Sequence, residues 1–125
     1  METNEHFFPM LYLYRRQTPD SGGPGRFRGG VGGERAFVPY DTPRPLDSTL
    51  FSFGGEAPAS AGISGGYPGG ACYMAIKRNS NLWEVFRRGK VAASLEDLEG
   101  DLDALPAMAR TRLGPNDVTL CAFPG

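Results

Sequence analysis

The chain has 125 residues, with 14 acidic and 13 basic side chains and a formal charge of −1. Its length predicts one domain, and its balanced charge argues against a general attraction to nucleic acid or to an anionic membrane. Hydrophobic residues make up 40% of the chain, which argues against simple disorder, and no apolar run could span a membrane. Because the N-terminus is polar and resembles no signal peptide, we expect a cytoplasmic protein with reduced thiols.

Three strands are expected in the first half of the chain. Residues 9–16 predict a strand with apolar or aromatic side chains on both faces, since tyrosine and leucine alternate there. Residues 34–40 and 47–53 are shorter strand-like runs. Proline cannot donate a ladder hydrogen bond, so Pro39 predicts that the run at 34–40 is a short strand or lies at a sheet edge.

Glycine and proline concentrate between these strands. Residues 19–70 hold 14 of the 18 glycines and 7 of the 11 prolines. The connections at 17–33 and 54–70 are longer than most loops, and loops of this length are usually functional or disordered. A third interpretation is that glycine-rich backbone packs closely against another chain, because no Cβ intervenes.

The remainder of the chain, residues 71–125, opens with an expected β-hairpin. Residues 71–78 predict a strand, and the polar residues 79–81 predict a tight turn. Residues 82–87 alternate between two faces, which favours a second strand and therefore a hairpin.

A short helix and a last strand are expected after this hairpin. Leucines at helical spacing predict a helix over residues 94–105, which Ser94 and Asp97 would open as a capping box. Residues 117–123 predict the last strand. The resulting fold class is mainly β: one irregular domain over residues 1–125, with five or six short antiparallel strands, long Gly/Pro-rich loops and this one helix.

The densest motif is the run Asp20-Ser-Gly-Gly-Pro-Gly-Arg-Phe-Arg-Gly-Gly-Val-Gly-Gly33. Its backbone N–H groups could bind phosphate, with Arg26, Arg28 and Arg35 adding charge. However, no Lys-Ser/Thr pair follows, and the next element is a strand rather than a helix. Arg28 and the two glycines after it resemble a single RNA-binding arginine-glycine-glycine element. Such elements act as repeats in strongly basic segments, which this chain lacks.

Catalysis and metal binding by this chain alone are disfavoured. Ser21 lacks the flanking pattern of a nucleophile elbow, and His6 is the single histidine that could serve as a base. Cys72 and Cys121 form no metal-binding motif. The favoured interpretation of the glycine motif is structural: its polar side chains satisfy loop N–H groups, and its arginines bind carbonyls or the acids of a partner.

Several motifs together resemble the hydantoinase B/oxoprolinase family. Residues 20–32 resemble the family's D-S-G-G-x-G-x-x-R-G-G-x-G stretch, and residues 5–9 its E-x-x-x-P element. Residues 62–69 are similar to its G-x-x-G-G-x-P-G loop, and residues 113–118 to the turn into its last strand, with Asn116 in place of the usual glycine. The resemblance covers nearly the whole chain but only the C-terminal portion of the family.

The resemblance implies a hydantoinase B tail made as a separate subunit, similar to the gamma subunit of acetophenone carboxylases. A complex of that type implies a hydantoinase-B-like large (beta) subunit and hydantoinase-A-like, ATP-binding subunits, with no nucleic acid and no membrane. It converts an aromatic ketone and bicarbonate to a β-keto acid. ATP, a divalent metal and bicarbonate are expected in the partner subunits. This chain is expected to bind no cofactor or metal and to be inactive alone.

The resemblance carries over no catalytic residue. It implies a conformational element at a subunit junction, formed by Asp20, Ser21, Gly22, Gly23, Gly25, Arg28, Gly29, Gly30, Gly32, Gly65, Gly66 and Gly69. Aromatic side chains often carry much of the binding energy of an interface, so we expect four interface anchors on residue type alone: Tyr12, Tyr14, Trp83 and Phe86. Two alternatives stay open, an ATP-dependent amidohydrolase subunit of the hydantoinase or oxoprolinase type and a free-standing RNA-binding or regulatory module.

Overall fold

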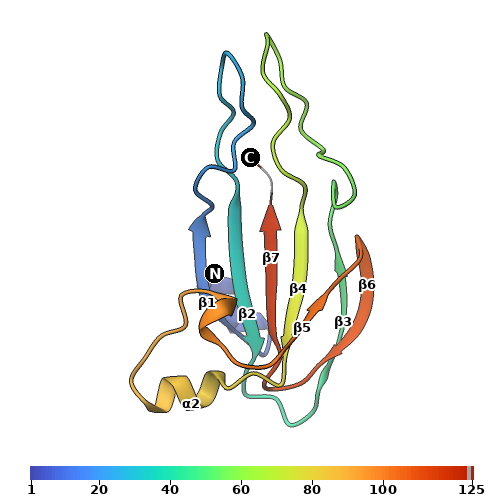
Figure 1. Cartoon of the computed structure of the whole chain (residues 1–125). Coiled ribbons are helices and arrows are strands. Elements are labelled where there is room, and N and C mark those ends of the chain that lie inside the picture. Colours follow the sequence, from blue (N-terminus) through green and yellow to red (C-terminus); the bar gives the residue numbers. More distant parts are fainter. Residues whose placement is uncertain (124) are drawn as a thin grey trace.

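Strands dominate the computed structural model, which describes residues 1–123 and 125 (Figure 1). Within these residues there are seven strands, two short α-helices and one 3-10 turn, so the predicted mainly β class is confirmed. The helical elements are α1 (Glu2–Phe7), α2 (Leu82–Arg87) and the 3-10 turn Leu95–Asp97. The strands are β1 (Met10–Gln17), β2 (Gly33–Pro39), β3 (Leu46–Phe51), β4 (Tyr73–Arg78), β5 (Asp101–Ala104), β6 (Met108–Leu113) and β7 (Val118–Phe123).

Five strands form the main sheet, in the order β1-β2-β7-β4-β5. Every neighbouring pair is antiparallel. Pro39 predicted a short strand or an edge position, but β2 is a seven-residue strand that lies between β1 and β7. The ladder between β2 and β7 ends at Phe37, which pairs with Thr119, so the missing N–H of Pro39 falls beyond it.

Two layers cover the main sheet, one on each face. On one face, β3 and β6 form a separate two-stranded ribbon. Leu50 and Leu113 from that ribbon pack against Phe37, Met74 and Ile76, and we call these residues the first cluster. On the other face, α2 and the segment after it cover the sheet. The buried residues on this face form a second cluster, which comprises Ala36, Val38, Leu82, Ala92, Leu95, Leu98 and Val118.

A β-bulge in β1 distributes its aromatic residues between the two clusters. The register shifts between Tyr12, which pairs with Phe37, and Tyr14, which pairs with Ala36. Tyr12 therefore packs with the first cluster and Tyr14 with the second. The predicted apolar character of both strand faces is confirmed, and the extra residue of the bulge is what allows two tyrosines at i and i+2 to point in opposite directions.

The predicted hairpin at 71–87 is wrong in its second half. Residues 82–87 form the helix α2, in which Leu82 is buried and Val85 and Phe86 pack beside it. These three positions have the spacing i, i+3 and i+4, so a helix places all of them on the sheet. The same six residues also alternate as a strand requires, so the local pattern fits a helix and a strand equally well. The contacts with the sheet decide in favour of the helix.

The predicted helix at 94–105 is also wrong. Only the 3-10 turn forms, and Asp97 caps it by accepting a hydrogen bond from the Ser94 N–H at 2.9 Å. Gly100 then adopts a φ of +128°, and its backbone passes close to the Arg78 carbonyl oxygen. The chain continues as β5 beside β4, so Leu102 is 59% exposed instead of continuing a buried leucine stripe.

The two glycine-rich connections project together from one end of the main sheet (Figure 1). We call residues 18–32 the first arm and residues 52–72 the second arm. An isolated β-bridge between Gly25 and Gly66 joins them. In the described residues, no helix is long and apolar enough to cross a bilayer.

Candidate functional site

Ser21 closes the base of the first arm. Its Oγ donates to the Thr18 carbonyl oxygen at 2.7 Å and accepts from the Gly32 N–H at 2.6 Å. The Thr18 N–H in turn donates to the Gly32 carbonyl oxygen at 2.9 Å. The hydroxyl is thus used in both directions by the loop's own backbone, which is a structural role rather than that of a nucleophile.

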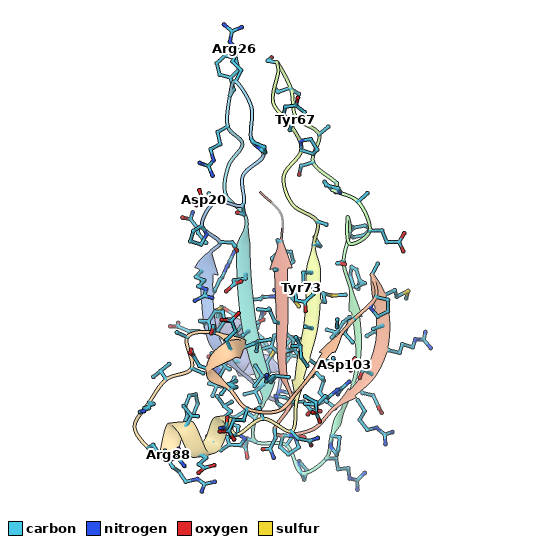
Figure 2. All side chains as sticks on the ribbon, in the orientation of Figure 1. Asp20, Arg26, Tyr67, Tyr73, Arg88 and Asp103 are labelled. Carbon is cyan, nitrogen blue, oxygen red and sulfur yellow. The ribbon has the colours of Figure 1, made fainter. Side chains whose placement is uncertain are left out.

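The arginines of the glycine motif do not converge on a shared anion site. Arg28 pairs with Asp20 of the same arm at 2.6 Å, and both side chains are largely exposed. Arg26 lies at the tip of the first arm, over the ring of Phe27 (Figure 2). Arg35 lies in β2, within the main sheet. A phosphate cradle that uses all three arginines is therefore not formed by these residues.

Backbone contacts hold the two arms together. The Tyr67 N–H donates to the Pro24 carbonyl oxygen at 2.8 Å, and the Arg26 N–H donates to the Gly65 carbonyl oxygen at 3.2 Å. An added Cβ at Gly23 would overlap the carbonyl oxygen of Tyr67. These glycines therefore permit a close approach between two segments of the same chain.

Gly25 shows the second reason for glycine at this junction. Its φ is +142°, which side chains rarely tolerate, and an added Cβ would lie 2.6 Å from the Gly65 carbonyl oxygen. The predicted motif positions of both loops thus meet at one junction. The glycines that face the opposite arm are Gly23 and Gly25 in the first arm and Gly65 and Gly66 in the second. Gly22 and Gly29 pack within the first arm, Gly69 packs against Gly125, and nothing lies within 4 Å of an added Cβ at Gly30.

The paired arms present large apolar side chains to the outside. Phe27 is 61% exposed in the first arm, and Ile63 and Tyr67 are 81% and 68% exposed in the second. All three residues line a hollow of about 300 Å³ between the arms. Apolar side chains gathered on projecting backbone are typical of a surface that another protein covers.

The four predicted aromatic anchors pack mainly against the chain itself. Tyr12 and Tyr14 are half-buried on opposite faces of the sheet. Trp83 packs edge-on against Phe86 at 5.8 Å, and its indole N–H donates to the Pro115 carbonyl oxygen at 2.8 Å. Their role as interface anchors stays a prediction, and the most exposed aromatic side chains lie elsewhere.

The residues that could supply chemistry are dispersed. His6 lies in α1, and no three His, Cys, Asp or Glu side chains gather to hold a metal ion in residues 1–123 and 125. Both cysteines are free. Burial raises the pKa of the Cys121 thiol against the opposing effect of the Arg35 charge, and burial also raises the pKa of Cys72. Raised pKa values disfavour the reactive thiolate.

Sequence reasoning missed Arg78, which organises the molecule, and assigned Arg35 to the glycine motif rather than to an inward position in its strand. Arg78, on β4, pairs with Asp103 and Asp117 and donates to Thr111 and Arg112 of the ribbon strand β6, but residues so far apart in sequence leave no local signal. Arg35 could have been found, because alternation in the predicted strand places it on the same face as the buried Phe37. A charged residue at an inward position of a strand is rarely buried without a partner, and this is the signal that singles out Arg35.

A family model, a curated relative and a solved structure each match this chain. A model of the Hydantoinase B/oxoprolinase family matches residues 1–125. The acetone carboxylase alpha subunit of Xanthobacter autotrophicus (strain Py2) is 34% identical over 90 residues, which are 71% of this chain and 11% of that subunit. A nucleotide-free structure of acetone carboxylase matches with a TM-score of 0.73 at 25% identity, over 100% of this chain and 18% of that chain. The chain spans less than a fifth of either relative.

Proposed function

The chain belongs to the hydantoinase B/oxoprolinase family, and from this membership we propose that it is a non-catalytic subunit of an ATP-dependent carboxylase complex. In this proposal it completes the fold of a hydantoinase-B-like large subunit. The observation that carries the proposal is that the whole chain matches a small part, 18%, of a solved acetone carboxylase chain.

The paired arms support the proposal as the element that docks. Their backbones are fixed by contacts with each other, and their apolar side chains Phe27, Ile63 and Tyr67 face outward. Rigid backbone with exposed apolar side chains binds a partner at little cost in conformational entropy. We place the subunit junction here, at the motif positions from Asp20 to Gly32 and from Gly65 to Gly69.

In the proposal, ATP, the divalent metal and bicarbonate bind to the partner subunits. The residues of this chain do not fit those groups. The arm arginines Arg26 and Arg28 point to different neighbours, and no cluster of three metal-ligating side chains forms in the described part of the chain. We therefore derive no reaction step through this chain.

We propose an aromatic ketone, such as acetophenone, as the substrate of the complex, and a β-keto acid as its product.

Purification of the tagged chain from its source, followed by native mass spectrometry, tests the assembly. Hydantoinase-A-like and hydantoinase-B-like subunits are expected in a fixed ratio, with ketone-dependent ATP hydrolysis. ATP hydrolysis that depends on a hydantoin or on 5-oxoproline would favour the amidohydrolase alternative. A folded monomer without partners would refute the subunit proposal.

Arg28→Ala tests the junction itself. The pair between Arg28 and Asp20 is exposed, so its loss is expected to change the stability of the isolated chain by less than about 0.5 kcal/mol. Weaker assembly at unchanged stability would therefore report on a contact with the partner. Unchanged assembly and activity would exclude Arg28 from the junction.

A further inference from the structure

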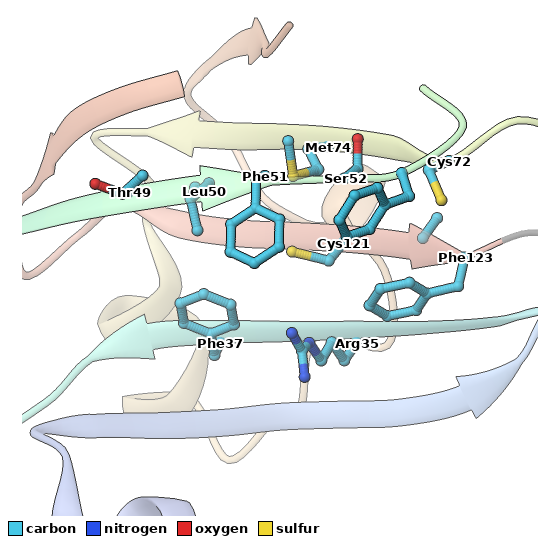
Figure 3. Close-up of a pocket in the computed structure, with 12 residues that line it drawn as sticks. Arg35, Phe37, Thr49, Leu50, Phe51, Ser52, Cys72, Met74, Cys121 and Phe123 are labelled. Atoms are coloured by element: carbon cyan, nitrogen blue, oxygen red, sulfur yellow. The ribbon is translucent and has the colours of Figure 1, made fainter. Parts of the chain in front are cut away.

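An apolar groove opens between the β3–β6 ribbon and the main sheet (Figure 3). It has a volume of about 340 Å³. Its walls include Phe51 at the end of β3, Phe53 at the start of the second arm, Met74 from β4, and Cys121 and Phe123 from β7. It is separate from the hollow between the arms, which different residues line.

The rim of this groove is aromatic and exposed. Phe51 and Phe53 are 64% and 78% exposed, and their rings meet edge-on at 5.9 Å. Phe123, on the opposite wall, is 44% exposed. Three phenylalanines around one groove form a continuous apolar patch, and such patches mark sites of protein association.

A guanidinium group lies in this groove without an acid partner. Arg35 stacks over the ring of Phe123 at 5.3 Å, and its Nε is buried with no hydrogen-bond acceptor among the described residues. Its direct neighbour across the ladder is Arg15, and neither arginine takes part in an ion pair within residues 1–123 and 125. Like charges directly opposite each other are unfavourable, so this surface is complementary to a carboxylate.

The positive charge of the groove and the larger size of the relatives together indicate what binds in the groove. The chain corresponds to 18% of the acetone carboxylase chain, so most of a polypeptide of that kind lies outside this chain. We infer that the groove receives a segment of the hydantoinase-B-like large subunit, with an apolar side chain seated among the phenylalanines and an adjacent Asp or Glu paired with Arg35. This inference rests on the proposed function.

Substitutions at the groove test the inference by measuring the Kd of this chain for the purified large subunit. Arg35→Met removes the charge and keeps an apolar stem, and Phe53→Ser changes a side chain that is 78% exposed. Each is expected to raise the Kd at least tenfold, and the Arg35→Met complex is expected to depend less on salt. The matched controls, Arg87→Met and Val91→Ser, change exposed residues outside the groove lining and are expected to stay within twofold.

Thiol protection provides a readout that does not depend on the folding of a groove variant. Cys72 lines the groove and is partly exposed. Its alkylation by N-ethylmaleimide is expected to slow at least tenfold in the complex, whereas a reporter cysteine introduced by Arg87→Cys keeps its rate. Equal Cys72 rates in the free chain and the complex would overturn the inference.

The outcomes separate this inference from the proposed function. A complex that forms with an unchanged Kd for Arg35→Met and Phe53→Ser overturns the groove contact and leaves the subunit role standing. Failure of the wild-type chain to bind the large subunit overturns both. Self-association of the isolated chain that Phe53→Ser abolishes would assign the groove to a second copy and would also overturn the inference.

Discussion

Nη1 of Arg78 lies 3.1 Å from Oδ2 of Asp117, and this pair fixes the end of β4 to the turn that leads into β7. The same guanidinium donates to the Thr111 hydroxyl at 2.6 Å and the Arg112 carbonyl oxygen at 2.8 Å, both on β6, and pairs with Asp103 on β5. Asp117 also accepts the backbone N–H groups of Asn79 and Gly114. One arginine thus fixes how the ribbon meets the main sheet.

Replacement of Arg78 is expected to destabilise the chain. Arg78→Met removes a donor from two carboxylates, a hydroxyl and a carbonyl, and the side chain of Arg78 is only 23% exposed. We expect a loss of about 2–3 kcal/mol in the free energy of unfolding, measured with urea. Arg112→Met is the control, because the pair between Arg112 and Asp47 is exposed and is expected to contribute less than about 0.5 kcal/mol. Equal effects of the two substitutions would contradict this account.

Gly23→Ala is expected to separate the arms. The new Cβ would overlap the Tyr67 carbonyl oxygen, and backbone cannot yield as a flexible side chain does. Hydrogen exchange of the Tyr67 amide, which donates to Pro24, is expected to accelerate at least tenfold. Gly30→Ala is the matched control in the same motif, since nothing lies within 4 Å of its added Cβ. Exchange rates that match between the two variants would contradict the proposed packing.

Thr119→Val is expected to stabilise the chain. Thr119 is fully buried in β7, and its hydroxyl has no hydrogen-bond partner among the described residues. Exchange of the hydroxyl for a methyl group removes this unsatisfied group at nearly constant shape, a gain of about 1 kcal/mol. Thermal unfolding measures it. Thr119→Ser, which keeps the hydroxyl and deletes the methyl group, is expected to destabilise, and a less stable Thr119→Val would show that the hydroxyl is satisfied.

Stability is expected to fall at alkaline pH. Burial raises the pKa values of Cys121 and Cys72 in the folded state, so the folded chain holds these protons more tightly than the unfolded chain does. Their contribution is fully present below the ordinary thiol pKa of about 8.5 and is lost as pH rises through the folded values. Urea unfolding between about pH 7 and 10 measures the slope. Cys121→Ala is expected to flatten it, and an unchanged slope would exclude this thiol as the cause.

Local pattern predicted β1, β2, β3, β4 and β7, because alternation and β-branched or aromatic residues act within a few positions. It did not predict β5 or β6, so the expected five or six strands became seven in the described residues. Local pattern failed at residues 82–87 and 94–105. There the same apolar residues fit both the helical and the strand periodicity, and contacts with the sheet decide which structure forms. For the candidate site, sequence predicted that Ser21 serves its own loop. It could not predict that the partner of Gly23 is Tyr67, since a contact between residues 44 positions apart leaves no local trace.

The position of β7 has a consequence for the order of assembly. β7 lies between β2 and β4, yet it is synthesised after both of them. Until it emerges from the ribosome, the pairs β1–β2 and β4–β5 have no strand between them, and β2 and β4 each present an unpaired edge. Because an unpaired edge can associate with other strands, we expect the yield of folded chain to depend on chaperones that shield strand edges.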